Sequence, residues 1–295
     1  GRNRIHVHTP DDSELVRRHS ELQWVSEIRR SLEEDGFELY CQPILKLDAR
    51  DRPATHFEIL TRYRARDGEL VLPGAFIPAA ERYNLMGAID RWVIATVFAG
   101  LGNLTRSNPG AHDDLLLTIN LSGDSINDPS LRDYVLIQAQ HHRLNPRQIC
   151  FEITETKAIS NLQRTVPLIE TLRGAGFRFA LDDFGSGLSS FGYLKTLPVD
   201  FLKIDGSFVK DIVEDTLDHA FVSAINTLGH VMGKTTIAEY VEGEAIAQAL
   251  QKLGVDFGQG FGLGRPIPLR EAIPGLSRGR APDIWSSSAD AQTAD

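Results

Sequence analysis

Residues 177–205 read FRFALDDFGSGLSSFGYLKTLPVDFLKID and contain two short apolar segments that each end in charged residues. The first ends in Asp182 and Asp183, and a glycine-rich loop follows. The second ends in LKID, which supplies Lys203 and Asp205. Carboxylates beside such apolar runs are costly to bury unless they lie at an open strand end near a cation. The stretch therefore predicts two strands whose charged ends meet.

At least three other apolar segments also end in polar residues. They reach Glu58, Asn120 and Glu152. An isolated pair of aspartates most often begins a solvated loop. Because the pattern recurs along the chain, we expect these polar residues to gather where parallel strands end.

The composition is that of an ordinary protein with a large core. The 295 residues are 42% hydrophobic, which suits one barrel-sized domain or two small ones. The net charge of −9 argues against a surface that coats duplex nucleic acid. Cys41 and Cys150 lie inside apolar runs without zinc-type spacing, so we expect buried, reduced thiols.

Neither export nor membrane insertion is indicated for this segment. The N-terminus lacks the apolar core of a secretion signal. The longest apolar stretch, residues 92–101, is too short to span a bilayer. We expect a cytoplasmic domain without membrane contact of its own, in a parent protein that an upstream region could anchor.

The two ends of the chain are predicted to lie outside the domain. Residues 1–19 contain a short strand pattern and a polar connector, and are expected to link an upstream domain. Residues 277–295 end in SSSADAQTAD, which is typical of a disordered tail. The domain itself is expected to cover residues 20–276.

Apolar periodicity predicts eight strands, with helices after most of them. The strands are expected at residues 37–44, 55–60, 115–119, 149–153, 179–181, 201–205, 235–238 and 255–258. The helices are expected at residues 21–32, 73–81, 89–101, 131–141, 162–174 and 218–232.

The connector between the first two strands is too short for a crossover helix, so this pair should be antiparallel. Later strands are separated by helices and should be parallel. The prediction is an α/β fold, a TIM-like (β/α)8 barrel with one antiparallel strand.

In such a barrel the polar residues would converge at the carboxyl ends of the strands. They are Glu58, Asn120, Glu152, Asp182, Asp183, Lys203, Asp205, Glu239, Glu242 and Gln259. Oxygen ligands without Cys or His favour Mg²⁺ or Mn²⁺ over zinc. So many acids suit two ions roughly 3.5–4 Å apart that share a bridging aspartate, an arrangement that hydrolyses phosphate esters.

Several short motifs resemble those of the EAL-domain cyclic di-GMP phosphodiesterases. They are EIL with Arg62, INLS, EITE, DDFGSG, LKID, AEYVE and QGF, and they occur in the family's order over nearly the whole domain. The resemblance implies a barrel with one reversed strand, two divalent cations and hydrolysis of cyclic di-GMP to linear pGpG in bacterial signalling. The N-terminal GRNRIHVH resembles the end of a GGDEF domain, which implies an upstream GGDEF or sensor domain.

The resemblance also implies a role for each site residue. Glu58, Asn120, Glu152 and Asp182 would hold one metal ion, Asp182 and Asp183 the other, with Glu239 nearby. Lys203 would orient and help to activate the attacking water, and Gln259 would help to position groups at the metal site. The implied catalytic set is Lys203, Glu239, Gln259, Glu58 and Asp182.

Residues around this centre would bind the substrate or support the site. The implied substrate contacts are Gln42, Leu60, Arg62, Pro78, Asp205, Phe261 and Pro266. Glu155 and Glu242 would brace the neighbouring loops. Taken alone, Arg62 would more simply be interpreted as one partner of a surface ion pair. Phe261 would more simply be interpreted as a core residue. Dimerisation rests on the family's habit.

Two positions depart from the family's pattern. Ile59 stands in the motif that names the family and is expected to repack a wall at little cost. Tyr240 stands where glycine is usual and is expected to shift Glu239 or to narrow the groove. Two other functions stay open: a catalytically silent cyclic di-GMP receptor, and an unrelated Mg²⁺ barrel acting on another phosphate ester.

Overall fold

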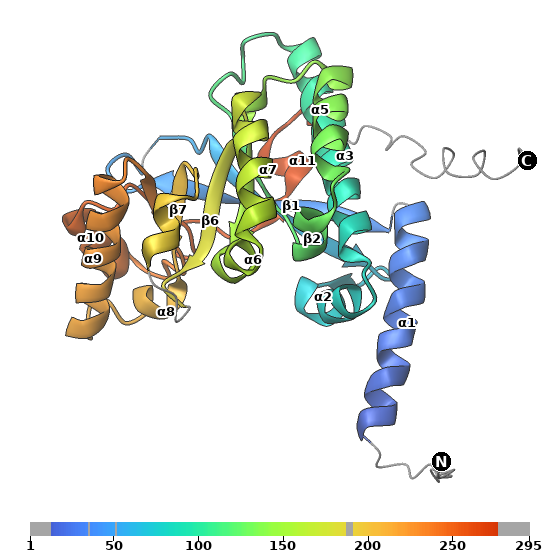
Figure 1. Cartoon of the computed structure of the whole chain (residues 1–295), viewed down its shortest axis with the longest axis horizontal. Helices are drawn as coiled ribbons and strands as arrows, with labels where there is room; N and C mark the ends of the chain where they lie inside the picture. Colours follow the sequence, from blue (N-terminus) through green and yellow to red (C-terminus); the bar gives the residue numbers. More distant parts are fainter. Residues whose placement is uncertain (1–12, 35, 51, 187–190, 277–295) are drawn as a thin grey trace, which may run out of the picture.

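Eight strands close into a barrel in the computed structural model, which describes residues 13–34, 36–50, 52–186 and 191–276, with side chains from residue 21 onward (Figure 1). The barrel strands are β1 (Phe37–Lys46), β2 (His56–Arg64), β4 (Leu116–Asn120), β5 (Ile149–Thr154), β6 (Arg178–Phe184), β7 (Phe201–Ile204), β8 (Thr235–Ala238) and β9 (Phe257–Gly258). Two short strands, β3 (Leu70–Val71) and β10 (Ile267–Pro268), extend β2 and β1.

The helices lie between and around these strands. They are α1 (Ser13–Glu33), α2 (Pro73–Arg82), α3 (Met86–Ser107), α4 (Gly123–Asn127), α5 (Leu131–His142), α6 (Glu155–Ser160), α7 (Leu162–Gly174), α8 (Gly206–Val209), α9 (Thr216–Val231), α10 (Glu244–Leu253) and α11 (Leu269–Ala272), with 3-10 turns at Pro146–Gln148 and Phe191–Lys195. In Figure 1, α1 stands at one end of the molecule, and α9 and α10 stand at the other.

The prediction of one reversed strand is confirmed, and the reversed strand is β1. It pairs antiparallel with both of its barrel neighbours, β2 and β9. The pairs from β2 through β4 to β9 are all parallel. The antiparallel register sets Gln42 opposite Glu58, so the reversed strand adds a side chain beside the predicted metal ligands.

The interior of the barrel has an apolar floor. Six buried residues form it, one from each of six strands: Ile44, Leu116, Cys150, Ala180, Phe201 and Ile237. Because side chains alternate across a strand, the residue two positions later also faces inward. On the parallel strands β5 to β8 that residue is charged, namely Glu152, Asp182, Lys203 and Glu239, and on β4 it is Thr118.

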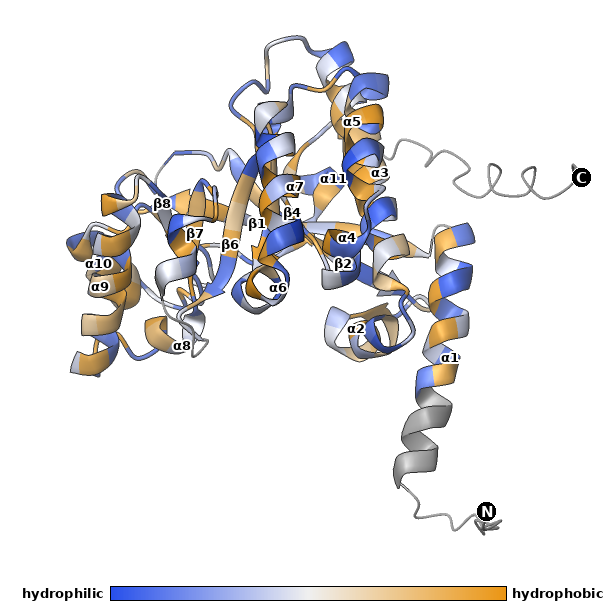
Figure 2. Cartoon of the chain, viewed as in Figure 1, coloured by the Kyte–Doolittle hydropathy of each residue, from blue (hydrophilic) through white to orange (hydrophobic). Residues whose placement is uncertain are grey.

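The outer face of the barrel packs against the helices in a second, larger core. Residues such as Phe151, Leu181 and Leu202 alternate with the inward ones and are fully buried there. Figure 2 shows β6 as hydrophobic along its middle and hydrophilic at the end near α8. The chain thus buries a continuous apolar layer on one side of each strand and leaves polar groups at one end of the barrel.

Some element predictions were wrong. The first helix was expected to begin at residue 21, but α1 begins at Ser13. Helix α10 was not predicted, and its first residue follows Gly243, which supplies no side-chain cap. The predicted strand pattern at residues 4–8 and the predicted tail lie outside the described residues. None of the described helices is long and apolar enough to cross a bilayer.

Asp90 is a buried acid that fixes the segment after β4. Its carboxylate accepts hydrogen bonds from Ser122 N at 2.8 Å and from Ser125 Oγ at 2.6 Å. Burial raises the pKa of Asp90 to about 6, although these hydrogen bonds oppose the rise. The folded state therefore binds a proton at Asp90 more tightly than the unfolded state does.

We predict that Asp90 makes the protein less stable as the pH rises through about 6. Its contribution is full below the unfolded pKa of 3.8 and is lost through the folded pKa. Between pH 4 and 7 the wild type should lose ~3 kcal/mol of unfolding free energy relative to Asp90→Asn. Chemical denaturation at several pH values measures this difference, with the exposed Asp113→Asn as control. Parallel curves for wild type and Asp90→Asn would contradict it.

Candidate active site

Lys203 lies at the centre of the polar end of the barrel. It is 1% exposed, and its ammonium lies within 4 Å of four acids on or just after four other strands. The Nζ atom lies 2.7 Å from Glu152 Oε1, 3.0 Å from Asp182 Oδ1, 2.9 Å from Glu239 Oε1 and 3.8 Å from Glu58 Oε2. The structure thus brings these predicted site residues together around one buried cation.

Glu58 joins this cluster to a set of amide side chains. Asn120 Nδ2 donates to Glu58 Oε1 at 2.7 Å, and Gln259 Nε2 donates to Glu58 Oε2 at 2.6 Å. Gln259 Nε2 also lies 3.1 Å from Gln42 Oε1, and Gln42 Nε2 donates to the carbonyl oxygen of Gly264. Both oxygens of the Glu58 carboxylate are therefore held by amides from neighbouring strands.

Burial and mutual repulsion set the electrostatics of the acids. Burial raises the pKa of Glu152 well above its usual range, and Asp182 adds to this. Burial also raises the pKa of Glu239 to about 7. Burial opposes ionisation of Asp182 as well, but the Lys203 ammonium holds its pKa below the usual value. Lys203 itself stays charged because these carboxylates raise its pKa despite burial.

The carboxyl end of β6 carries the second predicted acid in a strained conformation. Asp183 has a φ of 54°, in the left-handed region that non-glycine residues rarely adopt. Burial and the neighbouring Asp182 raise its pKa to about 6. Oxygen atoms of Asp182, Asp183 and Glu239 lie within 4.8 Å of one another, which is compact enough to hold a metal ion.

Glu155 supports this loop from the first residue of α6. Its Oε2 accepts a hydrogen bond from Gly185 N at 3.0 Å. Its Oε1 accepts one from Tyr193 Oη at 2.5 Å. The first contact is the one expected of a loop-bracing residue. The second could not be found from sequence, because only the folded chain brings Tyr193 to Glu155.

The donor set fits hard divalent cations. Glu152 Oε2 and Gln259 Oε1 are buried and have no hydrogen-bond partner among the described residues. Buried oxygen atoms without partners are costly, and a bound cation would satisfy them. The surrounding ligands are carboxylate and amide oxygens, which suit Mg²⁺ or Mn²⁺.

A pocket of about 210 Å³ opens beside the cluster, between the ends of β8 and β9. Eight residues line it: Gln42, Glu58, Glu239, Tyr240, Glu242, Gln259, Gly260 and Phe261. Of the predicted substrate contacts, only Gln42 and Phe261 belong to this lining. The others, Leu60, Arg62, Pro78, Asp205 and Pro266, lie outside it.

Several of these outer residues have distinct environments. Arg62 is 8% exposed, and its guanidinium lies 5.6 Å from the centre of the Tyr40 ring. Its Nη1 donates to the backbone carbonyl oxygen of Thr61 at 2.9 Å. Asp205 accepts from Ser207 N at 2.7 Å and caps α8. Pro78 is exposed within α2.

The EAL domain family matches residues 25–266 of this chain. The chain belongs to that family. Cyclic di-GMP phosphodiesterase PdeB of Shewanella oneidensis is 41% identical over 269 residues, which are 91% of this EAL chain and 31% of PdeB. The bifunctional diguanylate cyclase/cyclic di-GMP phosphodiesterase MucR of Pseudomonas aeruginosa is 34% identical over 257 residues. These residues are 87% of this chain and 37% of MucR. The chain therefore spans about a third of the length of these curated relatives.

Solved EAL structures have the same fold. The PaMucR phosphodiesterase in complex with c-di-GMP superposes with a TM-score of 0.78 and 34% identity, covering 85% of this chain and all of that one. The FimX EAL domain of Pseudomonas aeruginosa bound to c-di-GMP superposes with a TM-score of 0.74 and 29% identity. The match covers 82% of this chain and 96% of the FimX chain.

The two departures from the EAL pattern have different structural settings. Ile59 is 3% exposed and faces the outer core, away from Glu58. Tyr240 has a φ of 53°, which accounts for glycine being the usual residue at this position of an EAL domain. Its side chain lines the pocket beside Glu239.

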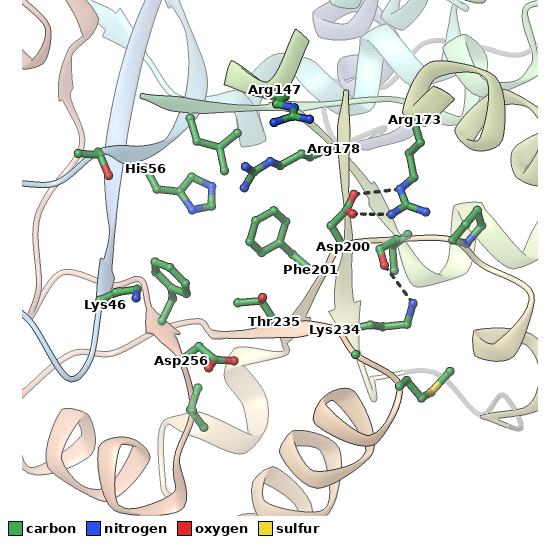
Figure 3. A pocket seen from close by; sticks show the side chains of 18 of the residues that line it. Lys46, His56, Arg147, Arg173, Arg178, Asp200, Phe201, Lys234, Thr235 and Asp256 are labelled. Carbon is green, nitrogen blue, oxygen red and sulfur yellow. Dashed lines mark hydrogen bonds and ion pairs between the residues drawn. The ribbon is translucent and has the colours of Figure 1, made fainter. Parts of the chain in front are cut away.

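A larger cavity of about 1170 Å³ lies at the opposite end of the EAL barrel, where the strands begin (Figure 3). It is lined by basic and acidic groups, and several of these are paired. Arg173 donates to Asp200, and Lys234 donates to the carbonyl oxygens of Leu197 and Val199. Asp113 and Asp114, which are exposed, also line it. Among the described residues, its lining shares none with the pocket beside the Lys203 cluster.

We predict that Lys203 and divalent cations compensate the same buried charge. Lys203→Met should lower the unfolding free energy by about 3 kcal/mol or more when divalent cations are chelated, because acids remain buried without a partner. Mg²⁺ or Mn²⁺ should recover part of this loss. Chemical denaturation with and without chelator measures both effects, and the exposed Lys252→Met is the control. Equal stability of wild type and Lys203→Met under chelation would count against this.

Proposed function

We propose that this EAL domain is a phosphodiesterase that hydrolyses cyclic di-GMP to linear pGpG with the help of two divalent cations. The observation that carries the proposal is the cluster around Lys203, which holds four of the six predicted metal ligands. Asn120 bonds to Glu58, and Asp183 lies with Asp182 and Glu239. The names of the relatives support the substrate, since PdeB and MucR are named for cyclic di-GMP phosphodiesterase activity.

The predicted ligands divide into two groups that share one residue. Glu58, Asn120, Glu152 and Asp182 would hold one ion, and Asp182 and Asp183 the other, with Glu239 nearby. When bound, divalent cations supply charge neutralisation at the phosphoryl and leaving oxygens and favour deprotonation of the attacking water. The compact triplet of Asp182, Asp183 and Glu239 supports the second of these sites.

Lys203 has the properties of a positioning and electrostatic group. Its pKa is raised well above the usual value, so it stays charged and cannot accept the proton of the water. A fixed ammonium can instead orient that water and favour its deprotonated form. Attack on phosphorus then breaks one bond to a 3′-oxygen and leaves a linear dinucleotide with a 5′-phosphate.

Residues at the rim are proposed to hold the dinucleotide. Arg62 offers a guanidinium that donates to a backbone carbonyl oxygen, and such a group suits a phosphate or a guanine edge. Phe261 is 55% exposed at the pocket, so its ring is open to a base. Leu60, Pro78, Asp205 and Pro266 would complete this groove, and Glu242 would support the loop that carries Tyr240.

We predict metal-dependent formation of pGpG from cyclic di-GMP. Glu58→Ala and Asp182→Ala should each lower kcat/KM by at least about a hundredfold, because each removes a carboxylate that holds charge at the reacting centre. Chromatography of the products with Mg²⁺ or Mn²⁺ measures turnover. The exposed Asp133→Ala provides a control with an unchanged site.

Two further conditions sharpen this test. Ca²⁺ should inhibit, because its longer and looser coordination would misplace the reacting water. Nucleotide binding is followed in parallel by calorimetry. Binding without turnover in the wild type would overturn the enzyme proposal and favour a silent receptor. Turnover of other phosphate esters but not of cyclic di-GMP would favour an unrelated substrate.

The proposal extends to the oligomeric state and to the location of the protein in the cell. The resemblance to the family implies a homodimer. The exposed apolar side chains of Val213, Leu217 and Phe221 form a surface that would suit such an interface. Leu217 and Phe221 lie one turn apart on α9, and the Phe221 ring contacts Phe208, which reaches the loop after β6. A cytoplasmic location and an upstream GGDEF or sensor domain stay predictions.

We predict that this surface mediates a homodimer. Phe221→Asp should convert the dimer to a monomer, because a charge in an apolar interface is costly. Analytical ultracentrifugation over a range of concentrations measures the mass. Ile137→Asp, which alters an equally exposed apolar residue on α5, should leave the dimer intact. A wild type that sediments only as a monomer would remove this proposal.

A further inference from the structure

Tyr240 occupies a backbone conformation that its side chain does not favour. Its φ of 53° lies in the left-handed region, which disfavours residues with bulky side chains. Such conformations persist where the surroundings hold them, and they gather at functional sites. Core packing does not explain the choice of tyrosine, because the side chain is 53% exposed.

One side of the Tyr240 ring is held by α8. A Cβ atom built on Gly206 would lie 2.1 Å from the Tyr240 ring, so only glycine permits this approach. The Lys210 ammonium lies 4.4 Å from the ring centre. Since Gly206 and Lys210 are four residues apart in a helical segment, they meet the ring from the same side. The contacts of α8 therefore fix the ring and leave its other face exposed.

The exposed face lies at the mouth of the catalytic pocket. Tyr240 lines that pocket together with Glu239, which contacts Lys203, and with Phe261. Phe261 is likewise exposed and carries the Arg265 guanidinium at 4.7 Å from its ring centre. Two exposed aromatic rings, each in contact with a cation, therefore line the pocket beside Glu58 and Glu239. An exposed aromatic face next to a phosphodiester site is suited to stacking with a nucleobase.

We propose that Tyr240 is a specificity-determining residue whose open face stacks against a purine base of the substrate, with α8 holding the ring from behind. The inference rests on the proposed function, since it assigns a contact for the same cyclic dinucleotide. Tyr240 takes no part in the chemical step. It strengthens binding by presenting a ring that is already immobilised.

The test compares hydrolysis by the wild type, Tyr240→Phe, Tyr240→Leu and Tyr240→Gly. Phenylalanine keeps the ring, so its KM for cyclic di-GMP should stay within about twofold of the wild type. Leucine and glycine remove the aromatic face, and each should raise KM about tenfold while kcat changes little. The preference for cyclic di-GMP over cyclic di-UMP should fall with the same two variants, because a purine offers the larger stacking surface.

A matched control separates stacking from relief of backbone strain. Arg143 also has a left-handed φ, of 56°, but lies at the end of α5. Arg143→Gly and Tyr240→Gly should both keep or raise the melting temperature, because glycine adopts this conformation freely. Only Tyr240→Gly should change KM.

The outcomes distinguish this inference from the proposed function. If the wild type turns over cyclic di-GMP and Tyr240→Leu and Tyr240→Gly have the same KM as the wild type, the role of Tyr240 is overturned. The phosphodiesterase proposal then stays intact. A fall in kcat with unchanged KM also overturns it, because the residue would then act on Glu239. If the wild type binds cyclic di-GMP without turnover, calorimetric Kd values replace KM, and the same tenfold loss supports stacking. A wild type that neither binds nor hydrolyses cyclic di-GMP overturns both the role of Tyr240 and the phosphodiesterase proposal.

Discussion

The site depends on one buried ammonium held among carboxylates. Lys203 is almost fully removed from solvent, and so is Glu152, its nearest partner. Taking either charge out of water alone would cost several kcal/mol, so each makes the burial of the other tolerable. The acids from other strands can then approach one another without unfolding the end of the barrel. The arrangement concentrates negative charge at the proposed cation site, and Lys203 compensates part of that charge.

The alternation of side chains along the strands puts these charges in place. Cys150 belongs to the apolar floor and Glu152 to the polar layer above it, and Phe201 and Lys203 repeat the relation on β7. The intervening residues face outward into the larger core. A shift of one residue in β5 or β6 would turn Glu152 or Asp182 from the barrel interior toward the apolar outer core. The same packing that closes the barrel therefore fixes which groups meet at its centre.

The sequence was sufficient for the architecture because its signals are local. Strand β8 and helix α7 have the predicted bounds, and the short connector after β1 correctly indicated an antiparallel pair. Helix α10 was missed because its start has no side-chain cap. Its amphipathic pattern did not compensate for that missing signal.

The geometry of the site was less accessible from sequence. That Glu58, Glu152 and Lys203 converge follows from their positions at strand ends. The hydrogen bond from Tyr193 to Glu155 and the approach of Tyr240 to Gly206 depend on how separate loops pack. No periodicity encodes such contacts, so they emerge only in the folded chain.

The reversal of β1 changes where the chain enters the barrel. In an all-parallel barrel the first strand begins at the floor, whereas β1 begins at the level where β2 ends, with Phe37 opposite Tyr63. Helix α1 therefore approaches from the end of the barrel that carries the candidate site. Its Trp24 packs edge-on against Tyr63 at 5.3 Å, and Glu27 accepts a hydrogen bond from the Tyr63 hydroxyl. Tyr63 adjoins Arg62, so α1 packs directly against the strand that carries the predicted substrate-binding arginine.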